Sequence, residues 1–157
     1  MSWLRALMLL ALIAWIGGLI FFAFVLAPTA FHVLPNTELA ASVVGPSLTA
    51  LHWIGIVSGL VFLLYSLLCN FVKHSQARVL SPVHVLIVLM LLLTGISQFV
   101  ITPRMRYLRS GPLSMDTPSA YAEFNHLHRW SERLEGGVLL LGLGVVVLTA
   151  RRFESSN

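Results

Sequence analysis

The sequence has few charged residues and a single cysteine. Only 10% of its 157 residues are Asp, Glu, Lys or Arg, whereas a soluble domain carries about 25%. Because so few charges cannot cover a water-facing surface, the composition excludes a soluble globular protein. Cys69 has no second cysteine to pair with, which excludes an intramolecular disulfide and a cysteine-based zinc site.

The sequence also lacks the basic stretches that bind nucleic acid. Its formal net charge is +4, but no basic helix and no stripe of basic and aromatic residues lies outside the apolar segments. We therefore expect no nucleic-acid partner, and we interpret the positive charge as information about membrane topology.

Apolar residues, by contrast, make up 57% of the chain, and the mean hydropathy is +0.87. They form four long runs, over residues 4–27, 48–72, 80–101 and 134–150. A membrane-spanning helix needs about 20 apolar residues. Three runs meet this length, and the fourth does so if its helix begins near Ser119. The sequence thus predicts an all-α fold, a single domain over residues 1–157 with four transmembrane helices at about 4–32, 46–72, 80–102 and 119–151.

These runs predict a multi-pass protein of the cell membrane, and of the bacterial inner membrane in particular. The lipid bilayer is then its first partner. The first run is longer than the roughly 7–15 apolar residues of a signal peptide, so we expect an uncleaved signal anchor.

The placement of lysine and arginine indicates the orientation. The first predicted connection carries no basic residue, whereas the second contains Lys73 and Arg78 and the C-terminal segment contains Arg151 and Arg152. This pattern predicts an N-in/C-in topology. The region 102–133 opposes it, because it would lie outside and yet carries five basic residues, namely Arg104, Arg106, Arg109, Arg129 and Arg133.

The predicted helices carry seams of small and polar residues. In the second helix His52, Gly55 and Gly59 share a face, and the GxxxG spacing of the two glycines lets helix backbones approach closely. The third helix repeats this spacing at Gly95 and Gln98. Packing within the bundle and a homodimer face both remain open as interpretations. The glycines predicted to pack against a neighbouring helix are Gly18, Gly55, Gly59 and Gly95.

Ionisable side chains are costly inside a membrane and are therefore candidates for function. The predicted topology brings polar side chains from all four helices to a similar depth near the outer face. Glu135 begins the fourth apolar run, so it needs a partner such as an arginine or a histidine. The candidate binding residues are His32, His52, Arg104, His128 and Glu135.

Three interpretations of this cluster are open. Its members can be interfacial anchors and ion pairs, a site for a small ligand, metal or cofactor, or a surface that meets another subunit. Neutral imidazoles can bind a transition metal, and two facing histidines can bind haem. His126 and His128 point about 200° apart on a helix, so these two would not chelate one ion together.

No catalytic residue is predicted. Glu135, His128 and Ser131 share a helix face, but no nucleophile elbow or oxyanion loop accompanies them. The leading hypothesis is a non-enzymatic membrane protein whose outer polar site handles a metal, haem or small ligand. The alternative is an accessory subunit of a larger membrane assembly, respiratory or photosynthetic, in which a histidine holds a pigment or haem.

Two segments resemble the transmembrane-protein-205-like domain family. The first is WIGGLIFFAFVLAPTAF at residues 15–31. In the second, FNHLHRWSERLEGG at residues 124–137, the family's F-x-x-L-H-x-x-S signature falls on Phe124, Leu127, His128 and Ser131. The family pattern continues to an Asn where this chain has Glu135. The resemblance implies a small integral membrane protein with four helices and no established molecular activity, and it adds no catalytic residue.

Overall fold

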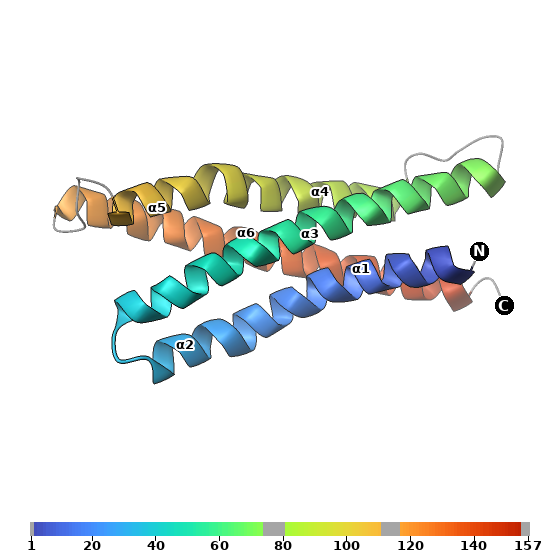
Figure 1. The fold of residues 1–157 in the computed structure, drawn as a ribbon. Coiled ribbons are helices and arrows are strands. Elements are labelled where there is room, and N and C mark those ends of the chain that lie inside the picture. The colour runs from blue at the N-terminus through green and yellow to red at the C-terminus, as the bar shows by residue number, and fades with distance from the viewer. Residues whose placement is uncertain (1, 74–80, 111–116, 155–157) are drawn as a thin grey trace.

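The computed structural model describes residues 2–73, 81–110 and 117–154, and all elements in these ranges are helical (Figure 1). Two short π-helical turns, η1 and η2, interrupt the first and third helical rods. In chain order the elements are α1 (Ser2–Phe21), η1 (Phe22–Leu26), α2 (Ala27–Val33), α3 (Thr37–Lys73), α4 (Pro82–Ile96), η2 (Ser97–Ile101), α5 (Thr102–Ser110) and α6 (Pro118–Glu154).

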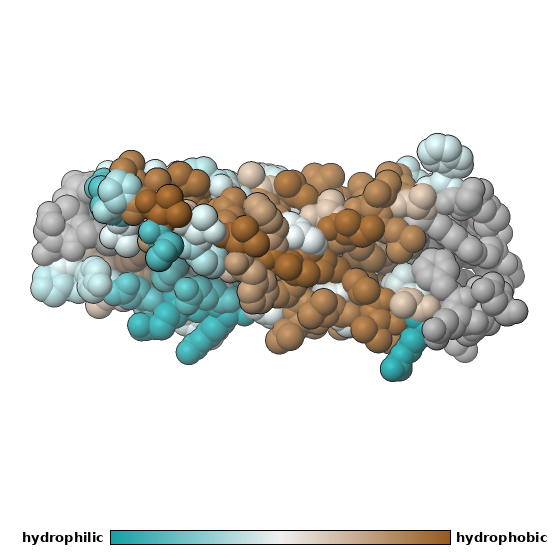
Figure 2. Space-filling view, turned by 90° about the horizontal axis from the view of Figure 1, so that it is seen from below, coloured by the Kyte–Doolittle hydropathy of each residue, from teal (hydrophilic) through white to brown (hydrophobic). Residues whose placement is uncertain are grey.

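Within the described residues, four helical rods are long and apolar enough to cross a membrane. Large apolar side chains such as Leu10, Leu64 and Leu140 are exposed on the outside of the bundle, as expected where lipid is the solvent. Figure 2 shows hydrophobic side chains over the middle of one face and most hydrophilic ones toward one end. The predicted four-helix membrane fold is confirmed. The candidate spans are Ala6–Val33, Thr37–Leu68, Pro82–Ser110 and Pro118–Arg151.

The chain is arranged as two helical hairpins (Figure 1). The first consists of α1, η1 and α2 followed by α3, and the second of α4, η2 and α5 followed by α6. The start of α1 and the end of α6 lie at one end of the molecule, which we call the terminal end. The opposite end, where α2 is joined to α3, is the far end. The hairpins pack together toward the terminal end and diverge toward the far end, and we call this divergence the fork.

The main core fills the part of the bundle between the terminal end and the fork. Five of its largest side chains are at most 2% exposed, namely Trp15, Phe62, Ile87, Met90 and Val138. They come from α1, α3, α4 and α6, so this core joins the two hairpins.

Close helix approach at glycines shapes this core. A Cβ atom added at Gly59 would lie 2.7 Å from Leu91 Cδ2 and 2.8 Å from Trp15 Cζ3, and one added at Gly55 would collide with the Trp15 indole. Gly18 is as tight, since its Cβ would lie 2.7 Å from Leu51 Cδ1. No side chain or other helix comes within 4 Å of the same position at Gly95, so the packing contact predicted there is not found.

The second rod starts at Thr37 rather than near residue 46 as the sequence predicted. The side-chain oxygen of Asn36 accepts the backbone N–H of Leu39 at 2.8 Å, which is a helix N-cap and fixes this earlier start. Pro46, interpreted from the sequence as part of a connection, lies inside α3.

The third rod also differs, because it continues past residue 102 to Ser110. Each π-helical turn is followed by a proline, Pro28 after η1 and Pro103 after η2, and these prolines explain the turns. A proline ring clashes with the carbonyl four residues earlier, and a wider turn relieves the clash. The N–H of Ala27 bonds to the carbonyl of Phe22 before Pro28, and the N–H of Thr102 bonds to that of Ser97.

At the far end, α5 lies against the start of α6 around a second, smaller core. Leu108, Ala120 and Phe124 form this core. The guanidinium of Arg104 donates two hydrogen bonds to the carboxylate of Glu123, at 2.7 and 3.0 Å. The far end of the second hairpin is therefore held together independently of the first hairpin.

Replacing Gly59 by leucine should destabilise the bundle by about 1–3 kcal/mol, because the added side chain overpacks the contact with Trp15 and Leu91. Gly95→Leu is the matched control, since the same addition at Gly95 meets no neighbour within 4 Å. Thermal unfolding of both variants in detergent measures the difference. Equal melting temperatures would show that the glycine seam does not set the packing.

Candidate functional site

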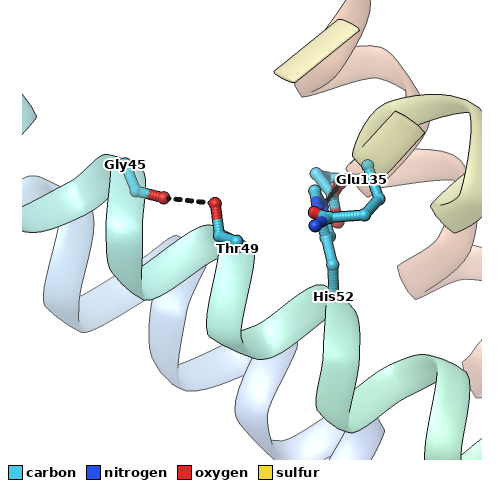
Figure 3. Close-up of polar contacts among 5 residues, drawn as sticks. Gly45, Thr49, His52 and Glu135 are labelled. Atoms are coloured by element: carbon cyan, nitrogen blue, oxygen red, sulfur yellow. Dashed lines mark hydrogen bonds and ion pairs between the residues drawn. The ribbon is translucent and has the colours of Figure 1, made fainter. Parts of the chain in front are cut away.

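A buried histidine, His52, joins three helical elements at the base of the fork. It lies on α3 with only 1% of its surface exposed. Its Nδ1 lies 2.8 Å from Oε1 of Gln98 on η2, and its Nε2 lies 2.6 Å from Oε1 of Glu135 on α6. Figure 3 shows the His52 and Glu135 side chains meeting end to end between their helices. The sequence predicted both of these residues as candidates, and the structure brings them into direct contact.

The hydrogen bonds of His52 fit two protonation states of this triad. The 2.6 Å contact between Nε2 and the Glu135 oxygen needs a hydrogen, because two lone pairs would otherwise face each other. The Gln98 amide can present its oxygen, which accepts from a protonated Nδ1, or its nitrogen, which donates to an unprotonated Nδ1. The group that Gln98 presents therefore sets whether the pair holds one proton more than a neutral imidazole and a carboxylate together.

Glu135 has further bonding capacity. Its side chain is 15% exposed, and its second oxygen, Oε2, is buried without a hydrogen-bond partner among the described residues. A buried polar atom left unpaired is costly, and in a membrane-spanning segment such a cost marks a functional candidate. The arrangement can hold the shared proton at Oε1 and bind a further donor at Oε2.

The site includes one residue, Gln98, that the sequence did not select as a candidate. Gln98 is 5% exposed, and its side chain fixes one nitrogen of His52. The available signal was its position on the predicted seam of the third helix. An uncharged amide draws less attention than an ionisable group, and only the three-dimensional contact with His52 shows its role.

The other three candidates lie elsewhere. His32 is exposed in the last turn of α2. Arg104 is paired with Glu123 at the surface. His128 lies 3.3 Å from Glu132 one turn along α6, and both side chains are exposed. These three are not part of the buried site.

The metal hypothesis receives no ligand set from the described residues. Within them, no group of three or more His, Cys, Asp or Glu side chains is placed to hold a metal ion. Both ring nitrogens of His52 are also engaged in hydrogen bonds, whereas a metal ligand needs a free lone pair.

The site lies where the hairpins begin to diverge. At the level of the site, the rings of Trp53 and Phe99 also join the hairpins and meet edge to face at 5.9 Å. Toward the far end, Nη1 of Arg109 donates to the backbone carbonyl of Ala41 at 3.4 Å. Thr49, one turn from His52 on α3, bonds to the carbonyl of Gly45 (Figure 3). Among the described residues, the His52–Glu135 pair is the last buried polar contact between the hairpins toward the far end.

A second buried histidine lies nearer the terminal end. His84 on α4 is 5% exposed, and its Nε2 is hydrogen bonded to the Ser66 hydroxyl of α3 at 2.7 Å. The interface between α3 and the rod formed by α4 and η2 thus has a polar contact at each end. Ile87 and Met90 of the main core lie between the two contacts, on α4.

Residues 10–111 match the family described as Domain of unknown function (DUF4149). The matched region contains His52 and Gln98 and ends before Glu135. No curated protein and no solved structure matches the chain.

His52→Ala should cost about 3–5 kcal/mol of stability, because it leaves the buried Glu135 without its partner. Glu135→Gln should cost less, about 1 kcal/mol, since its amide can still bond to the imidazole. Unfolding of both variants in the same detergent, beside Glu132→Gln as an exposed control, measures the ranking. A His52→Ala variant as stable as the control would mean that the contact does not support the fold.

Proposed function

We propose a function for a chain that belongs to the family described as Domain of unknown function (DUF4149). In this proposal the protein is a non-enzymatic multi-pass membrane protein. It binds a proton at the buried His52–Glu135 pair and thereby handles a small ligand near its outer face. The observation that carries this proposal is the 2.6 Å contact between two ionisable side chains that come from two different candidate membrane spans. Intramembrane ionisable pairs of this kind typically serve proton relays and ion pathways.

Histidine and a carboxylate suit this role for chemical reasons. Histidine is the side chain whose protonation ordinarily changes between pH 5 and 8, and a carboxylate in contact with it stabilises the protonated form. The proton can reside on either partner while the hydrogen bond between them is kept. The pair can therefore lose one proton, changing its net charge from 0 to −1, while His52 still donates a hydrogen bond to the carboxylate.

Gln98 extends this property. An amide can accept through its oxygen or donate through its nitrogen. When the pair loses its proton, the His52 hydrogen moves to the nitrogen facing Glu135, and a turned Gln98 amide donates to the other nitrogen. Both protonation states then keep two hydrogen bonds at His52, which lowers the cost of exchanging the proton in a buried site.

Proton binding is favoured over the cofactor hypotheses by the same contacts. Haem or a transition metal would need imidazole lone pairs that the hydrogen bonds to Gln98 and Glu135 already occupy. Absorption spectroscopy and metal analysis of protein taken from its native membrane test this preference. Stoichiometric haem or metal that depends on His52 would replace the proton proposal.

The location of the site near the outer face follows from an N-in/C-in orientation in the bacterial inner membrane. Lys73 ends α3 and Arg151 lies in the last turn of α6, and this orientation places both helix ends in the cytoplasm. The far end with the fork then faces outward. We also propose that the chain is related to the transmembrane-protein-205-like family, on the basis of the segments 15–31 and 124–137.

A second candidate function is that of an accessory subunit, or of one half of a homodimer. An apolar groove of about 450 Å³ between α1 and α6 favours it, because small residues such as Gly17 and Ala150 form part of its lining and small residues promote helix association in membranes. Native gels in mild detergent decide. Migration only at the monomer mass would exclude both assemblies.

Infrared difference spectra recorded across a pH change should show a carboxyl or imidazole signal that belongs to the pair. Glu135→Gln should remove the carboxyl component, and His52→Gln the imidazole component, whereas Glu132→Gln should leave both unchanged because Glu132 is exposed. If wild-type protein and the two pair variants give the same spectra at every pH, the pair does not exchange a proton and the proposed function fails.

A further inference from the structure

The two hairpins share a sequence motif at the same structural position. FVLAP at residues 24–28 and FVITP at residues 99–103 differ at only two positions. Each begins within a π-helical turn and ends on a proline, Pro28 in the first case and Pro103 in the second. Aligning these motifs makes α1 the counterpart of α4.

Burial follows the same alignment. Leu12 and Ile87 are counterparts, and they are 4% and 0% exposed. Trp15 and Met90 are counterparts and are 1% and 0% exposed. The leading helices of the two hairpins therefore present the same face to the core. Leu19 and Thr94 continue this register at 3% and 1%.

The returning helices α3 and α6 show the correspondence in their contacts. Both are 37 residues long. A Cβ at Gly59 would contact Trp15 and Leu91, whereas one at Gly142 would contact Met90 and Ile16. In the alignment, Trp15 corresponds to Met90 and Ile16 corresponds to Leu91. Each residue that Gly59 contacts is therefore the counterpart of a residue that Gly142 contacts.

This relation makes Gly142 the counterpart of Gly59. In the same register, the counterpart of His52 is Glu135. The two partners of the buried pair thus occupy equivalent positions, one from each hairpin, and they contact each other directly. The paired side chains themselves differ, a histidine in one half and a glutamate in the other, and the counterpart of Gln98 in the first hairpin is Ala23.

We infer that the chain is an internal repeat of two equivalent halves, and that these halves rock about the His52–Glu135 pair as a proton-coupled carrier. Membrane carriers are often built from repeats whose ion sites lie at the repeat interface, with proline-interrupted segments in corresponding places of the two halves. The inference rests on the proposed proton site and adds to it a motion and its axis. Gain or loss of the proton changes how wide the fork stands open.

The contacts on either side of the pair suit this motion. Toward the terminal end the halves share the main core, so they are held together there. Toward the far end, the described polar contact between them is the single 3.4 Å hydrogen bond from Arg109 to Ala41. Because the halves are closely packed toward the terminal end and joined by few contacts at the far end, the far ends can move while the main core stays in place.

Few other charges face the pair from the elements packed against it. The described side chains of α1 include no ionisable residue, and the partner from η2 is the neutral Gln98. On α6 the ionisable neighbours in sequence are Glu132 and Arg133, both exposed. A pH-dependent motion that is lost in variants of the pair is therefore assigned to the pair.

Spin-label distances in the full-length chain, with Cys69→Ser as background, test the inference. Labels at Leu39→Cys and Tyr121→Cys report on the far end, and labels at Leu64→Cys and Val147→Cys report on the part nearer the terminal end. All four positions are exposed. In phosphatidylcholine–phosphatidylglycerol vesicles, the far-end distance should change by about 5 Å or more, one helical turn, between acidic and alkaline pH. The second distance should stay constant.

Glu135→Gln should abolish the far-end change, and His52→Gln is the second variant in case the first does not fold, with the constant second distance as the check of folding. A constant far-end distance in a protein whose pair titrates in the infrared would overturn the rocking motion and leave the proposed proton site standing. Equal changes at both ends would also overturn it, because they would indicate general loosening. Absence of titration would instead remove the proposed function itself.

Discussion

The short contact between His52 and Glu135 is the interaction on which the rest of this structure depends. Neither side chain is tolerated alone at a buried position in a membrane-spanning bundle, and together they satisfy one another at 2.6 Å. Their contact requires α3 and α6, the returning helices of different hairpins, to stay in register. Gln98 adds the third element. The pair thus connects the halves of the fold and supplies its principal chemical feature.

Packing on the terminal-end side of the pair makes the contact between His52 and Glu135 possible. Trp15 fills the space that Gly55 and Gly59 leave open, so that α1 lies close against α3 and the main core stays compact. On the far-end side of the pair the packing changes, because the helices of each hairpin pack mainly against each other rather than against the other hairpin. The Arg104–Glu123 pair and the small core around Leu108 hold α5 to α6. The site is therefore located at the boundary between a shared core and a divided far end.

Much of this arrangement was predictable from the sequence. Spans, the glycine seam at Gly55 and Gly59, and the candidates His52 and Glu135 all follow from hydropathy and helical spacing. The predicted gathering of His32, Arg104 and His128 with them was based on depth alone, and residues at one depth can face different directions. These three side chains are exposed. Gln98 was placed on a seam but not recognised, since its role depends on which helix lies opposite.

By itself, the sequence determined that the chain crosses a membrane, how many times it does so, and which residues are costly enough there to need partners. These properties are local, because apolar length and helical periodicity are read along one segment at a time. Only the tertiary structure decided which partner each costly residue receives. It also showed that His52 and Glu135 occupy equivalent positions of two like hairpins. Such pairing depends on helix order and rotation in space, which many distant contacts set together.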